Sequence, residues 1–173
     1  MALVALALGL LLERPPLEQI NVTPQAVLWG VASCLPLLAA LMLAVRWPVG
    51  PLSELERISD QFIVPMFRRC SLLELAIVAI LAGIGEEMLF RGVVQEAIAH
   101  RFGPAVGLIA ASLLFGLAHP ITHTYAVLAG LIGFYLGGLW MWSDNLLPPI
   151  LCHACYDFAA LVYLVRRGQQ RQT

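Results

Sequence analysis

The chain has 173 residues, of which 60% are hydrophobic and 12% are charged, and its net charge is −1. Soluble domains carry about 25% charged residues. The composition therefore excludes a disordered chain and a soluble coiled coil, and it favours a membrane protein. A chain without a basic face is also not a nucleic-acid binder. All ten cationic residues are arginines, which excludes chemistry that depends on a lysine amine.

Long apolar runs follow one another along the chain. A membrane-spanning helix needs about 20 predominantly apolar residues. The run at 2–12 is too short to span alone, and we interpret it as a short or truncated first helix. Five longer runs follow, at 25–45, 71–98, 104–118, 121–142 and 147–165. The sequence thus predicts an all-α, polytopic membrane helix bundle with about six transmembrane helices.

The segment between the second and third runs is amphipathic. It mixes arginines with acidic residues, and its apolar residues are spaced roughly as one helical face: Leu52, Leu55, Ile58, Phe62 and Phe67. This pattern predicts an interfacial amphipathic helix over residues 52–69. Its apolar face could equally cover the bundle from one side.

The arginines are distributed unequally between alternate loops. Arg14 and Arg101 fall on one side, and seven fall on the other: Arg46, Arg57, Arg68, Arg69, Arg166, Arg167 and Arg171. Because cytoplasmic loops carry the excess of arginine, we expect the large loop and the C-terminus to be cytoplasmic. The glycine pairs Gly103/Gly107 and Gly133/Gly137 predict helices whose backbones approach closely.

Ionisable residues inside the apolar runs are costly, at least about 2.5–3.5 kcal/mol for a charge at the bilayer centre. Glu86, Glu87 and Arg91 lie in the third run. Glu87 and Arg91 are four residues apart and can pair on one helical face. Glu86 points about 100° away from that pair, so it stays free to take a proton.

Two further polar positions have the same helical spacing. Phe115 and His119 are four residues apart at the end of one run, and His153 and Asp157 are four apart in the last run. Asp157 can orient the His153 ring and fix its tautomer. A glutamate, two histidines and an aspartate on three different apolar helices predict a functional polar site in the core of the bundle.

Several kinds of chemistry are compatible with these residues. A nucleophilic Ser112 or Cys155 is weakly supported, because neither lies in a recognisable nucleophile motif. A zinc site with Glu86, His119 and His153 as ligands is geometrically possible. The remaining possibility is a water molecule activated by Glu86 without a metal, with the histidines polarising the carbonyl group of the substrate.

The order of these motifs resembles a known family. Glu86-Glu87-x-x-x-Arg91, Phe115-x-x-x-His119 and His153-x-x-x-Asp157 are similar to the motifs of the CPBP family. This family comprises CAAX prenyl endopeptidases and membrane proteins of bacteriocin processing and self-immunity. The resemblance implies one integral membrane domain over residues 1–173, with a motif core at 71–165.

The resemblance also implies roles for these residues. The family members are intramembrane glutamate-dependent proteases, long described as metalloproteases. Glu86 would activate the water with the help of His119. The oxyanion would be stabilised by His153 and Asp157. The supporting residues would be Glu87, Arg91 and Phe115. Some family members have Asn in place of Asp157. A carboxylate cannot donate to an oxyanion, so Asp157 would either be protonated or hold His153.

The implied biology follows from the same resemblance. We expect an endopeptidase in the cell membrane that needs no cofactor, unless zinc is used as above. Its substrates would be membrane-embedded or lipid-modified peptides, either prenylated and CAAX-like or of the bacteriocin type, with the lipid bilayer as its other partner and no nucleic acid. The alternative is a non-catalytic scaffold or immunity protein that binds a partner through the same polar cavity.

Overall fold

The computed structural model describes residues 1–170, so Arg171 of the arginine-rich tail lies outside the described residues. Within residues 1–170 the chain is built from helices joined by short loops and contains no β-strand. The α-helices are α1 (Ala2–Leu11), α2 (Pro24–Arg46), α3 (Ser53–Ile58), α4 (Val64–Phe67), α5 (Leu72–Leu89), α6 (Glu96–Phe102), α7 (Pro104–Leu117), α8 (His123–Ser143) and α9 (Leu147–Gln170). The predicted all-α bundle is confirmed.

Two segments of π-helix interrupt the α-helices. Ser59–Ile63 joins α3 to α4, and Phe90–Gln95 joins α5 to α6. The apolar run predicted at 71–98 is therefore not one regular helix. A π-helix adds about one residue per turn, so it changes which side chains share a face after it.

Local sequence signals set the beginnings of the long helices. Ser71 and Glu74 form a reciprocal capping box at the start of α5. The hydroxyl groups of Thr23 and Thr122 cap α2 and α8 by accepting from backbone N–H groups. Between α6 and α7, Gly103 has a φ of +92°, a conformation that favours glycine, and Pro104 follows at the first position of α7.

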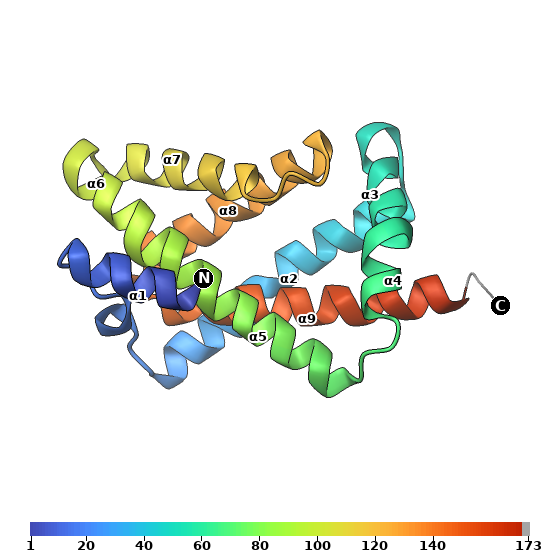
Figure 1. Cartoon of the computed structure of the whole chain (residues 1–173), viewed down its shortest axis with the longest axis horizontal. Coiled ribbons are helices and arrows are strands. Elements are labelled where there is room, and N and C mark those ends of the chain that lie inside the picture. Colours follow the sequence, from blue (N-terminus) through green and yellow to red (C-terminus); the bar gives the residue numbers. More distant parts are fainter. Residues whose placement is uncertain (171–173) are drawn as a thin grey trace.

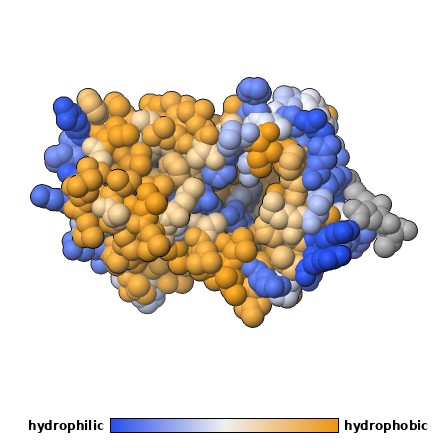
Figure 2. Space-filling view, viewed as in Figure 1, coloured by the Kyte–Doolittle hydropathy of each residue, from blue (hydrophilic) through white to orange (hydrophobic). Residues whose placement is uncertain are grey.

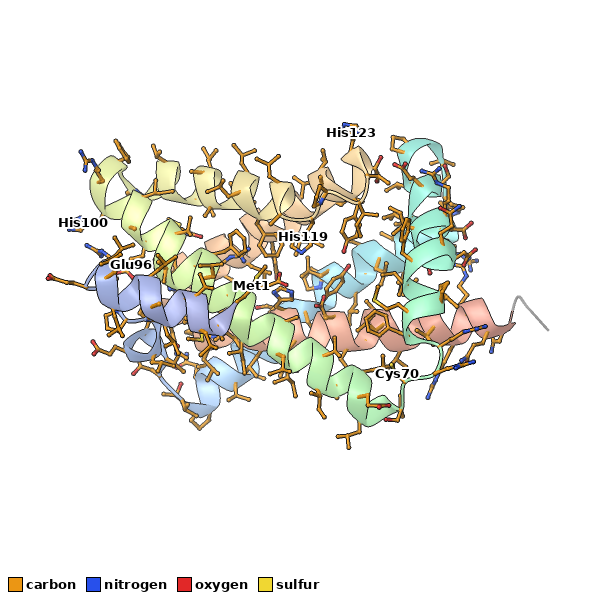
Figure 3. All side chains as sticks on the ribbon, viewed as in Figure 1. Met1, Cys70, Glu96, His100, His119 and His123 are labelled. Carbon is orange, nitrogen blue, oxygen red and sulfur yellow. The ribbon has the colours of Figure 1, made fainter. Side chains whose placement is uncertain are left out.

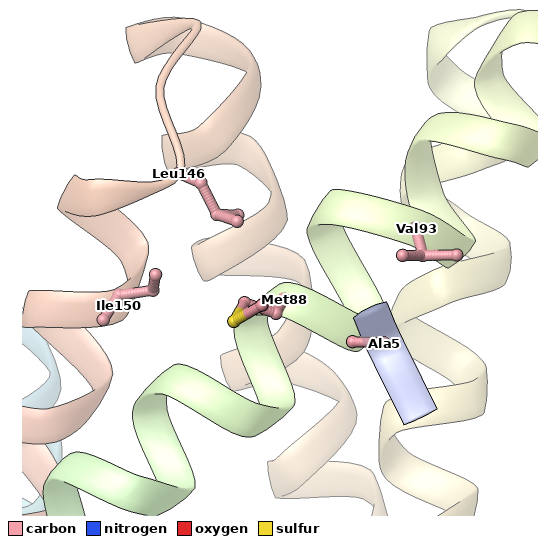
Figure 4. Packing of buried hydrophobic residues seen from close by; sticks show 5 residues of the cluster. All are labelled: Ala5, Met88, Val93, Leu146 and Ile150. Atoms are coloured by element: carbon pink, nitrogen blue, oxygen red, sulfur yellow. The ribbon is translucent and has the colours of Figure 1, made fainter. Parts of the chain in front are cut away.

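The long C-terminal helix α9 organises the bundle. It packs against both α2 and α5, while α7 packs against α8 (Figure 1). At the N-terminal end of α9, Ala5, Met88, Val93, Leu146 and Ile150 form one buried apolar cluster that joins α1, α5 and the π-helical segment after it (Figure 4). The predicted short first helix is thus part of the bundle.

The surface of the bundle is unusually apolar. Large side chains such as Leu28, Leu81, Leu113 and Leu131 are each more than 60% exposed. Figure 2 shows apolar residues over most of the visible surface, and hydrophilic residues at the two ends of the long axis and in a hollow between them. Exposed apolar area on this scale is rare on soluble monomers and marks contact with a membrane or a partner.

In the part of the chain that the structure describes, three helices are long and apolar enough to cross a membrane, namely α2, α8 and α9. The other three expected spans are shorter or more polar. Helices α1 and α7 have 10 and 14 residues, and α5 has 18 residues with Glu74, Glu86 and Glu87 among them. By length and composition, three of the six expected spans among residues 1–170 are therefore confirmed as helices that could cross a membrane.

The amphipathic stretch forms a cap over one end of the bundle, which we call the cap segment (residues 50–67). Its residues Leu52, Leu55, Ile58, Ile63 and Phe67 line a cavity in the bundle. The prediction that Phe62 lies on the same face as these residues is wrong. Its side chain is 48% exposed, and Ile63 lines the cavity instead. The cause is the π-helical segment, which lengthens the spacing after Ile58 from four residues to five.

Close packing of α7 against α8 leads to a first prediction. A Cβ on Gly116 would lie 2.6 Å from the Ala126 carbonyl oxygen, whereas a Cβ on Gly138 would meet nothing within 4 Å. Gly116→Ala should lower the free energy of unfolding by about 1–3 kcal/mol. Gly138→Ala should leave it unchanged or raise it by up to about 1 kcal/mol. Thermal unfolding in detergent, followed by circular dichroism, measures both, and an equal loss in the two variants would contradict the packing.

Candidate active site

A buried ion pair lies at the centre of the site. The Arg91 guanidinium donates to Oε1 of Glu87 at 2.8 Å, and both side chains are almost fully buried, with 1% and 0% exposure. The pairing expected from their spacing is therefore present. Each buried charge carries a desolvation cost of several kcal/mol, which is offset only when the remaining donors and acceptors are also engaged.

Arg91 is engaged on two further sides. Its second guanidinium nitrogen donates to the Gly133 carbonyl in α8 at 2.9 Å, and its guanidinium carbon lies 4.5 Å from the centre of the Phe115 ring in α7. One turn further along, Gln95 donates in the same way to the Gly137 carbonyl at 3.2 Å. Gln95 was not predicted from the sequence as part of this polar core.

The glycines of α8 have a different role from the one expected. A Cβ on Gly133 would lie 3.2 Å from the Phe115 side chain and 3.4 Å from the Arg91 guanidinium, and a Cβ on Gly137 would lie 2.5 Å from the Gln95 side-chain oxygen. These glycines leave room for two polar side chains that bond to their carbonyl groups. The close backbone approach predicted for such pairs occurs instead at Gly107, where a Cβ would lie 2.7 Å from the Gln95 carbonyl oxygen.

His153 joins the site from α9. Its Nδ1 lies 2.7 Å from the same Glu87 oxygen that pairs with Arg91, and its Nε2 lies 3.3 Å from Oδ2 of Asp157. Because a carboxylate only accepts, Nδ1 is the donor toward Glu87. The ring is thus oriented by Glu87 on one side and faces Asp157 on the other. The sequence indicated only the second of these contacts.

Glu86 and His119 lie together on the other side of the site. Oε2 of Glu86 lies 3.6 Å from Nε2 of His119, beyond ordinary hydrogen-bond distance. The other ring nitrogen of His119, Nδ1, lies 2.7 Å from the Phe115 carbonyl oxygen, to which it donates. Oε2 of Glu86 is buried and accepts no hydrogen bond within residues 1–170. It is therefore available to take a proton.

Phe115 forms the floor between the two histidines. Its ring centre lies 4.6 Å from that of His119, 6.0 Å from that of His153 and 5.0 Å from that of Phe90. With Arg91 on the ring as well, Phe115 contacts the ion pair and both imidazoles. Phe115, which we expected to support the site, is therefore an aromatic ring packed beneath it, where it excludes water.

Glu86, His119, His153 and Asp157 all line one cavity of about 810 Å³. They come from α5, the end of α7 and α9. Figure 3 shows His119 directed toward the interior of the bundle, with His100 and His123 at its outside. The convergence expected from the sequence is thus present, and His123 has no place in the site.

Most of the cavity wall is apolar. It extends from the four polar residues along α2, α8 and α9 to the cap segment. At the cap the lining becomes polar again, with Glu56, Ser59, Asp60 and Arg167. Tyr125 and Tyr156 also line the cavity, and nothing in the sequence motifs had singled them out.

The cap segment is attached to the bundle by polar contacts. Glu56 accepts from the Arg167 guanidinium of α9 at 2.7 Å, and the Gln169 side chain donates to the Arg68 carbonyl oxygen at 3.0 Å. Glu54 interacts with Thr124 near the start of α8, and hydrogen bonding with this side chain is the main cause that lowers the pKa of Glu54. The cap is therefore held from both α8 and α9.

The histidines of the possible zinc site have other partners. Among residues 1–170, no group of three or more His, Cys, Asp and Glu side chains is arranged to hold a metal ion. Of the zinc ligands considered from the sequence, His153 has both ring nitrogens directed at carboxylates. Neither nitrogen is thus directed toward Glu86 and His119.

Comparisons with known proteins point to one family. The model of the family "Type II CAAX prenyl endopeptidase Rce1-like" matches residues 68–159, just over half of the chain. The chain is also similar to the uncharacterized protein YpbD of Bacillus subtilis, with 27% identity over 148 residues, which cover 83% of this chain and 72% of that protein. No solved structure matches the chain.

The buried ion pair leads to a second prediction. Arg91→Gln leaves the Glu87 carboxylate buried without its cation, and breaking a buried pair in this way costs about 3–5 kcal/mol. Arg57→Gln is the matched control, because Arg57 pairs with Glu54 but is 59% exposed, and such pairs contribute little. Unfolding in detergent should show a large loss for the first variant and a small change for the second. Equal effects would mean that the buried pair does not stabilise the bundle.

Proposed function

This chain belongs to the Rce1-like family of type II CAAX prenyl endopeptidases, and from this membership and the geometry of the site we propose that it is an intramembrane endopeptidase. It is an integral membrane protein, and we place it in the cell membrane with several spans. Its substrates are peptides that are embedded in the bilayer or carry a lipid modification, of the CAAX or bacteriocin type. The reaction is hydrolysis of a peptide bond by a water molecule that Glu86 activates.

The observation that carries this proposal is the Glu86–His119 pair. The two groups face each other across 3.6 Å at the wall of the cavity, so one water molecule in the cavity can contact both of them from the side. Because Nδ1 of His119 donates to Phe115, the ring is fixed with Nε2 toward Glu86. A water molecule held there loses its proton to Glu86 as its oxygen attacks the carbonyl carbon, which is general base catalysis.

His153 is suited to stabilise the negative charge that then develops. Two carboxylates, Glu87 and Asp157, lie against its two ring nitrogens, and Arg91, which pairs with Glu87, is the permanent cation beside them. This balance favours the protonated ring, whose Nε2–H can turn from Asp157 to the substrate oxygen. A donor of this kind contributes about 2.7–4 kcal/mol to the stability of the transition state. Asp157 faces the Nε2–H before the substrate binds, and it does not itself donate to the oxyanion.

The cavity is suited to an apolar substrate. Its volume of about 810 Å³ lies within the usual range of ligand sites, roughly 300–1,000 Å³. Apolar side chains of α2, α8 and the cap segment line most of it, and the polar residues gather at its ends. A peptide with apolar side chains or a lipid tail buries these in the wall and presents its backbone to Glu86.

The role of Glu86 is tested by Glu86→Gln. Removing a general base should lower kcat about 10²–10⁴-fold, since the amide cannot take the proton from water. Cleavage of a farnesylated CAAX-type peptide in proteoliposomes, followed by mass spectrometry, measures the rate.

The matched control is Glu74→Gln on the same helix. Glu74 lies at the exposed start of α5, and glutamine preserves a capping box there. This variant should cleave at the wild-type rate. If Glu86→Gln also cleaves at that rate, Glu86 is not the base. The alternative is a non-catalytic scaffold or immunity protein. It would be supported if the wild type cleaves no peptide and Glu86→Gln restores the phenotype of cells that lack the protein as well as the wild type does.

Metal dependence provides a separate test. We propose that the reaction needs no metal, because His153 directs both ring nitrogens at carboxylates and leaves no set of three ligands. Cleavage should be unchanged by prolonged chelation, and metal analysis of the active protein should find no stoichiometric zinc. Zinc at one equivalent, with activity lost on chelation and restored by zinc, would establish the zinc mechanism with Glu86, His119 and His153 as ligands.

A further inference from the structure

Two hydroxyl groups in the cavity have no part in the mechanism described so far. Tyr125 and Tyr156 line the cavity together with the four polar residues. Within residues 1–170 the structure shows no hydrogen bond made by either phenolic hydroxyl. A phenol is a neutral donor, which the rest of the site lacks, because carboxylates only accept and both imidazoles use Nδ1 for fixed contacts with Glu87 and Phe115.

Tyr125 lines the cavity beside His119. Its ring centre is 6.2 Å from that of His119. Its phenol interacts electrostatically with both Asp157 and Glu86. The backbone at Tyr125 is fixed as well, because its N–H donates to the Thr122 hydroxyl in the first turn of α8. The phenol therefore belongs to the capped first turn of α8 and lines the same cavity as the base and the His153–Asp157 pair.

Tyr156 has a different position. It interacts electrostatically with Asp157 and with Tyr125, and its side chain packs against the buried apolar cluster of Cys34, Leu136, Leu139 and Cys152. It shares the cavity but not the interaction with Glu86. A donor to the reacting carbonyl must lie near the attacking water as well as near the oxyanion. Of the two tyrosines, Tyr125 is the one whose ring has a contact with His119, which faces the base.

We propose that Tyr125 is a further catalytic residue, whose hydroxyl donates a hydrogen bond to the carbonyl oxygen of the scissile peptide bond. This assignment rests on the proposed function. As the water oxygen bonds to the carbonyl carbon, its proton passes to Glu86 and the carbonyl π electrons move to the oxygen, where Tyr125 and His153 stabilise them. When the C–N bond breaks, Glu86 returns the proton to the leaving nitrogen. Tyr125 keeps its own proton throughout.

The test compares Tyr125→Phe with Tyr156→Phe and Glu86→Gln, by cleavage of the farnesylated CAAX-type peptide in proteoliposomes. Loss of one oxyanion donor should lower kcat of Tyr125→Phe about 100-fold with KM nearly unchanged, because the bond strengthens only in the transition state. Tyr156→Phe loses the same hydroxyl from the same cavity and should keep the wild-type kcat. Tyr125→Phe should also bind a peptidyl difluoroketone, whose hydrate resembles the tetrahedral intermediate, more weakly by a similar factor.

The outcomes separate this proposal from the proposed function. If Glu86→Gln is inactive and Tyr125→Phe has the wild-type kcat, the role of Tyr125 is wrong and the glutamate mechanism stands. If kcat falls as much in Tyr156→Phe as in Tyr125→Phe, the loss of kcat is not specific to the hydroxyl of Tyr125, and the proposal is wrong. A Tyr125→Phe variant that fails to fold would assign the hydroxyl a structural role and overturn the proposal. An active Glu86→Gln would instead overturn the proposed function.

Discussion

The Glu87 carboxylate, buried and shared between Arg91 and His153, is the interaction on which the rest of the site depends. One of its oxygens accepts from the guanidinium at 2.8 Å and from the imidazole at 2.7 Å. Through Arg91 it also connects to the Gly133 carbonyl in α8 and to the Phe115 ring in α7. The buried Glu87 carboxylate thus connects helices α5, α7, α8 and α9, directly or through Arg91. A buried carboxylate tolerates few other arrangements, because each alternative leaves a charge without a partner.

This constraint reaches into the packing of the bundle. His153 reaches Glu87 only because α5 and α9 approach closely, and Gly83 makes that possible. A Cβ on Gly83 would lie 3.0 Å from the Ala154 nitrogen and from the Ile150 carbonyl oxygen. Directly after α5, the π-helical segment Phe90–Gln95 directs Arg91 and Gln95 toward carbonyl groups one turn apart in α8. Irregular turns of this kind are frequent at functional sites.

The sequence predicted those parts of the site that depend on spacing within one helix. The pairs Glu87/Arg91 and His153/Asp157 follow from a separation of four residues, and the cost of charge in an apolar run indicated that they would be buried together. The Glu87–His153 contact joins residues 66 positions apart, so it depends on how α5 packs against α9 and no local pattern contains it. The place of Tyr125 in the cavity likewise depends on how the helices pack, and no local pattern contains it. The exposed Phe62 shows a third limit, since a π-helical turn changes the periodicity from which faces are predicted.

An intramembrane hydrolase must bring water to a site that its apolar surroundings keep dry, and the shape of the cavity suggests how both requirements are met. The lining is apolar over most of its length, which strengthens every electrostatic interaction at Glu86 and His153 because the local dielectric is low. At the cap segment the lining includes Glu56, Asp60 and Arg167. On the proposed function, the apolar substrate is held along the wall, and water is stabilised by the polar side chains of the lining. The Glu56–Arg167 pair attaches the cap segment to α9, so it also holds these polar side chains of the cap in the cavity wall.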